Sequence, residues 1–336
     1  MQPNPRTQLR DLIAGHFVSR AIYVAAQLDI AHLLADGPKT CESLAQLSHT
    51  HADTLYRLLR ALASNGIFAE DGQGRFANTD LSELLRSDIP SSMHAMTLFT
   101  GDETMLTAWQ SLRHSVTTGE PAFEHVFGVQ HFEYLSQHPD KAKIFDDAMV
   151  SFSSMVNATV AKSYDFSAFK TVVDIAGGYG STLCAILKAN PGLRGILFDM
   201  PHVTEGARKY ISEQGVADRC DVVAGDFFGS LPAGADAYFM KHIIHDWDDE
   251  RCLKILRSCH AAMPGDGKLL VCERIVPPGN ARSYSKLGDL VMLMMTPGGR
   301  ERTEAQYRAL FADGGFELIR LVATESDFTV MESVKV

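Results

Sequence analysis

The chain has 336 residues, 46% of them hydrophobic and 21% charged, which is enough apolar material for about two ordinary folded domains. Its formal net charge of −10 argues against nucleic acid as a partner, because binding a phosphate backbone requires a concentrated basic surface. Six cysteines show no C-x-x-C spacing, which favours reduced, buried thiols in a cytoplasmic protein over a disulfide framework or a structural metal site.

Residues 7–155 show helical periodicity almost throughout. In the first segment, apolar residues recur every three or four positions, at Leu9, Leu12, Ile13, Phe17, Val24 and Leu28. The most apolar early stretch, residues 21–35, is interrupted by polar residues and is too short to span a membrane. A short amino-terminal region could not bury this apolar face alone, so we expect a homodimer built through residues 1–100.

Residues 41–79 resemble a winged helix-turn-helix. The pattern predicts helices over 41–47 and 53–63, followed by two short strands around the turn at 72–74. A DNA-binding regulator is therefore one candidate function. Residues 35–86 contain five basic side chains against seven acidic ones, a poor balance for contacting phosphates, so a scaffold used for packing and dimerisation is favoured.

From about residue 165 the pattern changes to strands that alternate with helices. The strand-like runs are 171–176, 195–199, 221–224, 236–240, 268–272, 316–322 and 327–335. This order is typical of an α/β fold with a doubly wound, mostly parallel sheet. The last two runs lie too close together for a crossover helix, so we expect them to form an antiparallel hairpin.

A glycine-rich turn, residues 176–180, follows the apolar run that ends in Asp174 and Ile175. Asp199 ends the next strand, where its carboxylate can accept hydrogen bonds from both hydroxyls of a ribose. The turn has Leu183 where the dinucleotide fingerprint needs its third glycine, and the chain has no P-loop. An adenosine ligand bound without a pyrophosphate cradle indicates S-adenosylmethionine, and an NAD-dependent dehydrogenase remains the alternative.

Polar side chains follow several predicted strands: Asp174, Asp199, Asp226 and Lys241. In open α/β sheets, ligands bind beyond the carboxyl ends of the strands, so these residues are expected to share one site.

His245 lies between a predicted strand and an amphipathic helix. An imidazole there can act as a general base at neutral pH, or it can simply belong to the start of the helix. Glu273 and Glu301 are candidates for orienting it, since a carboxylate that accepts one ring N–H raises the basicity of the other nitrogen.

Five motifs together resemble the plant caffeate/flavonoid-type O-methyltransferases and their bacterial natural-product relatives. They are residues 173–180, 198–203, 225–228, 245–250 and 297–303, in the family's order and spacing. The likeness covers nearly the whole chain. It implies that His245 is the catalytic base, flanked by Glu273 and Glu301, and that the acceptor is an aromatic small molecule.

The resemblance also implies the binding residues. Cofactor positions are Ser153, Asp174, Gly177, Asp199, Asp226, Phe227 and Lys241, and acceptor positions are Phe145, Met149, Asp246, Met292 and Thr296. No metal is expected. Ala176 and Tyr179 replace the more usual Gly and Thr of the glycine loop, and Tyr179 could change how the cofactor tail is held.

We therefore expect a cytoplasmic S-adenosylmethionine-dependent O-methyltransferase. Residues 1–100 would form a helical winged-helix-like dimerisation domain, 101–160 a helical connector that lines the acceptor pocket, and 161–336 a Rossmann-like class I methyltransferase domain. The close alternatives keep this fold and cofactor but methylate nitrogen, or hydroxylate or decarboxylate a polyketide.

Overall fold

The computed structural model describes residues 4–89 and 92–336, apart from the side chains of residues 152–155. The chain divides into two compact units, one of Met1–Leu106 with His138–Phe152 and one of Thr107–Gln137 with Ser153–Val336. Helices α7 (Glu103–Gln110) and α11 (Pro139–Ser163) each run across this division. The expected connector, residues 101–160, is therefore divided between the two units, with parts of α7 and α11 in each.

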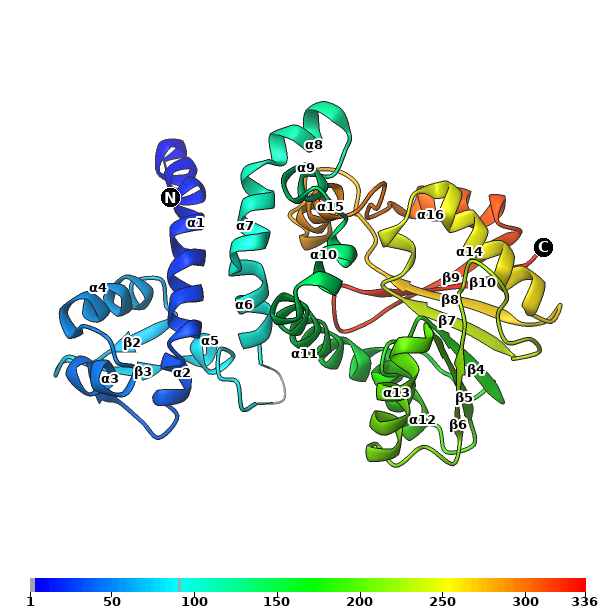
Figure 1. Cartoon of the computed structure of the whole chain (residues 1–336), viewed down its shortest axis with the longest axis horizontal. Coiled ribbons are helices and arrows are strands. Elements are labelled where there is room, and N and C mark those ends of the chain that lie inside the picture. The colour runs from blue at the N-terminus through cyan, green and yellow to red at the C-terminus, as the bar shows by residue number, and fades with distance from the viewer. Residues whose placement is uncertain (1–3, 90–91) are drawn as a thin grey trace. The chain divides into compact units, whose positions relative to one another are not determined.

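The first unit contains the long helix α1, several shorter helices and a small antiparallel sheet with the strand order β1-β3-β2 (Figure 1). Its further elements are α1 Pro5–Gln27, α2 Ile30–Leu33, β1 Lys39–Thr40, α3 Cys41–Leu47, α4 Ala52–Ala63, β2 Phe68–Glu70, β3 Arg75–Asn78, α5 Asp80–Glu83 and α6 His94–Gly101. The predicted helices and wing are present, and β1 is an addition that the pattern did not indicate.

The winged-helix part has its own core. Helix α4 buries Leu55, Leu59 and Leu62, whose spacing places them on one face of the helix. They pack in one cluster with Phe68 of β2 and Phe76 of β3. The cluster explains why so short a sheet is stable: its strands are covered by the apolar face of a helix.

The second unit is built on a seven-stranded sheet with the order β6-β5-β4-β7-β8-β10-β9. The strands are β4 Thr171–Ile175, β5 Arg194–Asp199, β6 Cys220–Ala224, β7 Ala237–Lys241, β8 Lys268–Glu273, β9 Phe316–Ala323 and β10 Thr329–Lys335. The first five pair in parallel, while β10 is antiparallel to both β8 and β9. This confirms the predicted sheet and its carboxy-terminal hairpin.

Helices connect these strands and precede the sheet. They are α8 Leu112–Thr118, α9 Ala122–Phe127, α10 His131–Gln137, α12 Ser181–Ala189, α13 Pro201–Glu213, the 3-10 helix η1 Ile244–Asp246, α14 Asp249–Ala262, α15 Tyr284–Met295 and α16 Glu304–Asp313. Thr303 opens α16 with a capping box, in which Thr303 and Gln306 satisfy each other's backbone N–H groups. No helix in the described ranges combines the length and apolar character needed to cross a bilayer.

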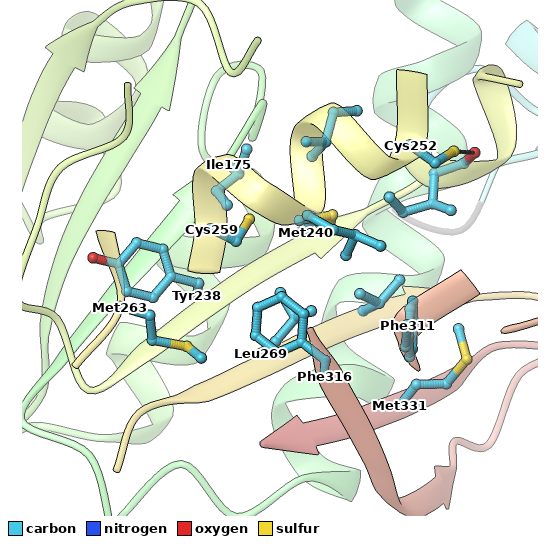
Figure 2. Close-up of a cluster of buried hydrophobic side chains, with 14 of the residues drawn as sticks. Ile175, Tyr238, Met240, Cys252, Cys259, Met263, Leu269, Phe311, Phe316 and Met331 are labelled. Carbon is cyan, nitrogen blue, oxygen red and sulfur yellow. Dashed lines mark hydrogen bonds between the residues drawn. The ribbon is translucent and has the colours of Figure 1, made fainter. Parts of the chain in front are cut away.

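A hydrophobic core of this unit lies between the sheet and helices α14 and α16. Figure 2 shows Tyr238, Met240 and Leu269 from the sheet packed with Phe316 and Met331 of the hairpin. Cys252 belongs to the same cluster, and its thiol donates a hydrogen bond to the carbonyl oxygen of Ile244. The core therefore extends to the base of the turn that carries His245.

Truncating Phe316 should destabilise this unit severely. Phe316 is fully buried in the cluster, so Phe316→Ala removes a ring and leaves a cavity that should cost about 3–5 kcal/mol of unfolding free energy. Ile319, on the same strand, is 47% exposed, and Ile319→Ala should change stability by no more than about 0.5 kcal/mol. Urea denaturation of both variants measures the difference, and equal losses would contradict this account of the core.

Candidate active site

The carboxyl ends of the five parallel strands bring most of the predicted polar residues to one edge of the sheet. Asp174 lies in β4, Asp199 ends β5, Lys241 ends β7 and Glu273 ends β8, and Asp226 follows β6. Parallel neighbours end at the same edge, so residues far apart in the chain come together here.

The turn after β4 has the shape of a ligand cradle. Gly178 and Gly180 adopt positive φ angles of 61° and 82°, which glycine tolerates without strain. At Gly177 an added Cβ would lie 2.4 Å from the Oδ2 of Asp174, so no larger residue fits without displacing that carboxylate. Ala176 also has a positive φ, 54°, where glycine is more usual.

Asp199 is held in place by the backbone around it. Its Oδ2 accepts a hydrogen bond from the N–H of Gly178 at 2.8 Å and its Oδ1 one from the N–H of Met200 at 2.7 Å. Each carboxylate oxygen has a second lone pair, so both can still accept from ribose hydroxyls. Burial raises the pKa of Asp199, and the two backbone hydrogen bonds oppose that rise.

Asp174 lies deeper, with 2% of its surface exposed, and its Oδ2 has no hydrogen-bond partner in the described structure. Burial raises the pKa of Asp174 to about 7, against the attraction of Lys241. A buried oxygen without a partner is costly unless a ligand satisfies it. The cradle, the free oxygen and the ribose-type carboxylate fit S-adenosylmethionine, which Asp174, Gly177 and Asp199 would hold.

The remaining cofactor positions differ in how far they are supported. The Oδ1 of Asp226 accepts the N–H of Phe228 in a tight turn, and the Phe227 ring lies 6.1 Å from the Trp247 ring. Lys241 is partly buried and burial lowers its pKa. Ser153 lies in α11, but its side chain falls outside the described residues.

His245 lies on η1 and is 5% exposed. Its Nδ1 is 3.2 Å from the Oε1 of Glu301 and 3.9 Å from the Oε2 of Glu273. A carboxylate can only accept, so Nδ1 carries the proton toward Glu301 and Nε2 remains to act as a base. The structure thus brings together the three residues that the sequence named.

The carboxylates determine the charge of this cluster. Burial lowers the pKa of His245, but Glu273, Asp246 and Glu301 outweigh it and raise that pKa to about 10. Asp246 adds a third carboxylate, with its Oδ1 3.5 Å from Nε2. Burial raises the pKa of Glu273 to about 7, partly offset by His245. The imidazole is therefore a strong base that mostly carries both ring protons at neutral pH. Only its neutral fraction has Nε2 free to accept a proton, and this fraction increases as the pH rises through the neutral range.

His245, Glu273 and Glu301 each offer an atom that could bind a metal ion, and these atoms lie within 4.8 Å of one another. The hydrogen bonds of these residues orient the imidazole of His245, which is a different role from binding a metal ion. The Oε1 of Glu273 accepts the N–H groups of Ile243 and Ile244, and Nδ1 of His245 faces Glu301. The two glutamates are therefore arranged to hold the imidazole of His245 in place.

The contacts of three further residues were not predicted from the sequence. His242 has a φ of 59°, stacks on Phe328 and meets the His245 ring edge-on at 4.6 Å. Asn157 of α11 binds Ser181 and Thr182 at the start of α12, at 2.9 and 2.6 Å. Arg302 is 1% exposed beside the His245 turn. Only Arg302 left a visible signal, its place within the motif 297–303.

The predicted acceptor positions are spread over both units. Thr296 is buried, and its hydroxyl bonds to the carbonyl of Met292 one helical turn earlier. Both belong to the second unit, as does Asp246. Phe145 and Met149 lie on α11 in the first unit, where the Phe145 ring packs edge-on against Phe99 at 5.5 Å.

Comparison with known proteins identifies this arrangement. The O-methyltransferase domain model matches residues 109–317, and the O-methyltransferase dimerisation domain model matches residues 10–88. The chain belongs to the O-methyltransferase family. The family match confirms the predicted resemblance, enzyme class and cofactor: this is an S-adenosylmethionine-dependent O-methyltransferase. The match therefore favours this enzyme class over the alternative of an NAD-dependent dehydrogenase.

Individual relatives cover almost the whole chain. Phenazine O-methyltransferase PhzM of Lysobacter antibioticus is 45% identical over 97% of this chain and 95% of its own length. Phenazine-1-carboxylate N-methyltransferase of Pseudomonas aeruginosa is 34% identical over 94% and 92%. The crystal structure of CalO1, a methyltransferase of calicheamicin biosynthesis in an S-adenosylhomocysteine-bound form, matches with a TM-score of 0.90 at 34% identity, covering 98% of both chains.

Removing the Asp199 carboxylate should weaken cofactor binding. Asp199→Ala loses charged hydrogen bonds to the ribose, which should cost about 1–3 kcal/mol of binding free energy for S-adenosylhomocysteine. Asp221, on the neighbouring strand β6, has a side chain that is 65% exposed, and Asp221→Ala should leave affinity unchanged. Isothermal titration calorimetry measures both, and tight binding of NAD that Asp199→Ala does not affect would refute this assignment.

Proposed function

We propose that the enzyme transfers a methyl group to a phenolic hydroxyl of an aromatic small molecule, with His245 as general base. The observation that carries this proposal is the hydrogen-bonding geometry of the buried imidazole, with Nδ1 3.2 Å from Glu301. The name of the phenazine O-methyltransferase supports a flat, hydroxylated aromatic acceptor, and a hydroxyphenazine is the first compound to test.

His245, Glu273 and Glu301 have different roles in the proposed methyl transfer. S-adenosylmethionine, when bound, supplies an electrophilic methyl group. A phenol with a pKa of about 10 is mostly protonated at neutral pH and is a poor nucleophile. Nε2 of His245 removes its proton while Glu301 and Glu273 stabilise the imidazolium that forms. Further acceleration comes from holding the acceptor oxygen in line with the methyl group.

Other parts of the chain support this role. We propose that Asp246, Met292 and Thr296 of the second unit line the acceptor site, with Lys241 beside the cofactor. Residues 1–100 would form the dimerisation domain, 101–160 the connector and 161–336 the catalytic domain. A cytoplasmic location is supported by the six cysteines, all of which are buried free thiols.

Methylation of nitrogen is the second candidate. The N-methyltransferase among the relatives supports it, because a similar chain acts there on a ring nitrogen. A ring nitrogen that carries no proton needs no general base, so the buried base of this chain favours the phenol. Hydroxylation or decarboxylation of a polyketide keeps the same fold, and no contact at His245 favours it.

The first unit supports a homodimer. Helix α1 exposes four large apolar side chains, Leu9, Leu12, Ile13 and Phe17, with exposures of 59%, 77%, 61% and 65%. Exposed apolar residues clustered on one helix mark an interaction surface. The match of the dimerisation domain model to residues 10–88 supports a second copy of this chain as the partner.

Replacing His245 should abolish most activity without affecting the cofactor. For His245→Ala we expect methyl transfer to a neutral phenol to fall by roughly 100- to 10,000-fold. Affinity for S-adenosylhomocysteine should stay unchanged, and the rate should recover as the pH approaches the pKa of the phenol. Equal rates for wild type and variant across the pH series would mean that His245 only belongs to the turn.

The dependence of kcat/KM on pH tests whether Glu301 raises the pKa of His245. Because the pKa of His245 is raised, wild-type kcat/KM should increase with pH through the neutral range. Glu301→Gln removes a negative charge, lowers the pKa of His245 and should move this rise to lower pH by about 1–3 units. Its loss of rate should be smaller than for His245→Ala. An unmoved profile would exclude Glu301 as the partner of the base.

Placing charge on α1 should separate the dimer. Leu12→Glu combined with Phe17→Glu puts two carboxylates into the proposed interface, where burying them is costly. Light scattering should give about twice the 36.9 kDa chain mass for wild type and the single-chain mass for the variant. Ile319→Glu, at an exposed site of the second unit, is the matched control and should remain dimeric. A monomeric wild type at micromolar concentration would contradict the dimer.

A further inference from the structure

The turn that carries His245 is too short to hold its own shape. It is a single 3-10 turn of three residues, Ile244–Asp246, with no side-chain cap. Such turns have poor hydrogen-bond geometry and seldom persist unsupported. The position of the imidazole must therefore be set by groups outside the turn.

Glu273 supplies one half of that support. Its Oε1 accepts the N–H groups of Ile243 and Ile244 at 2.9 and 3.0 Å, which fixes the amino-terminal side of the turn. The carbonyl groups of the turn need donors instead. A carboxylate cannot provide them.

Arg302 supplies these donors. Its Nη1 donates to the carbonyl oxygen of Ile244 at 3.0 Å, and its Nη2 donates to that of Trp247 at 2.9 Å, so one guanidinium spans the turn on either side of His245. Nη2 also donates to the Oδ1 of Asp249 at 2.7 Å. The guanidinium is planar and rigid, so several bonds made by one group fix direction as well as distance.

The backbone beside Arg302 packs on the same turn. The N–H of Arg300 donates to the carbonyl oxygen of His245 at 2.8 Å. At Gly299 an added Cβ would lie 2.8 Å from that same oxygen, so only glycine allows this approach. Glu301, between these residues, reaches the imidazole itself. Residues 299–302 therefore hold both the backbone and the side chain of His245.

We propose that Arg302 is a positioning residue for methyl transfer: its guanidinium fixes the carbonyl side of the His245 turn and thereby keeps the imidazole between Glu273 and Glu301. The proposal rests on the proposed role of His245 as general base. Arg302 reaches no reacting atom and acts only through the turn.

The test compares Arg302→Lys and Arg302→Met with wild type, using a phenolic acceptor. A displacement of about 1 Å in the base can cost on the order of 100-fold in rate, so Arg302→Met should lower kcat 10- to 100-fold. KM for the acceptor and affinity for S-adenosylhomocysteine should change less than threefold. Lysine provides a single ammonium group with three N–H donors but no planar fork, so Arg302→Lys should restore part of the loss.

The pH profile separates positioning from a purely structural role. The charged and titratable groups around His245 are Glu273, Glu301, Asp246, His242, Arg274, Tyr307 and Arg302 itself. Loss of the positive charge of Arg302 would by itself raise the pKa of His245, so a fall in that pKa reports displacement of the imidazole. The carboxylates raise its pKa, so an imidazole displaced from them should have a lower pKa. In Arg302→Met the rise of kcat/KM should move to lower pH. If Arg302 only stabilises the fold, melting temperature falls while kcat and pH profile stay at wild-type values, which would overturn the proposal.

Two further variants serve as a control away from the site and as a milder change at Arg302. Arg308 of α16 pairs with Glu304 and donates to the carbonyl of Leu318, so Arg308→Met matches the substitution away from the site and should keep full activity. Asp249 is half exposed, and Asp249→Asn keeps an oxygen that can accept from Arg302 but removes the negative charge paired with the guanidinium, which weakens its hold. That variant should show the same pH shift on a smaller scale, even if Arg302→Met does not fold.

A chemical readout distinguishes failure of this proposal from failure of the proposed function. Diethyl pyrocarbonate modifies accessible imidazoles, and peptide mass spectrometry reports the rate at His245. Arg302→Met should speed this modification. If His245→Ala is fully active but Arg302→Met still exposes His245, the general base is wrong and the positioning stands. Wild-type modification and wild-type kcat in Arg302→Met would overturn the positioning itself.

Discussion

The structure around the active site depends on the buried carboxylate of Glu273. This side chain is fully buried at the end of β8, where one oxygen binds the N–H groups of Ile243 and Ile244 and the other faces His245. An isolated buried carboxylate is strongly unfavourable. The fold therefore has to bring partners to it, and the pairing of β8 with β7 does so by placing the His245 turn directly beside it.

The same edge of the sheet serves two different tasks because its strands are parallel. Strands β4 and β5 end at the cofactor cradle, with Asp174 and Asp199, while β7 and β8 end at the base. In each place burial raises the pKa of a carboxylate, Asp174 in one and Glu273 in the other. Such shifts are typical of sites where a ligand or reaction completes the electrostatics. The cofactor cradle and the proposed general base are thus positioned by separate pairs of strands.

The first unit combines a winged-helix fold with a surface that is acidic and, on α1, apolar. Its helices α3 and α4 and the β2–β3 wing form a cored winged-helix arrangement. Its surface has more acidic than basic side chains in residues 35–86 and an exposed apolar face on α1, which favours contact with protein over contact with phosphates. Surface chemistry, and not the backbone fold, decides what such a unit binds.

The sequence by itself determined the order and type of the elements, the sheet class and the strand ends that carry Asp174, Asp199 and Lys241, because these follow from local periodicity and turn chemistry. It named Glu273 and Glu301 only as candidates. Tertiary structure decided which ring nitrogen Glu301 faces, and that Arg302 clamps the turn. These contacts join residues 28 to 58 positions apart, and side-chain direction across such separations is set by packing, which no local pattern encodes.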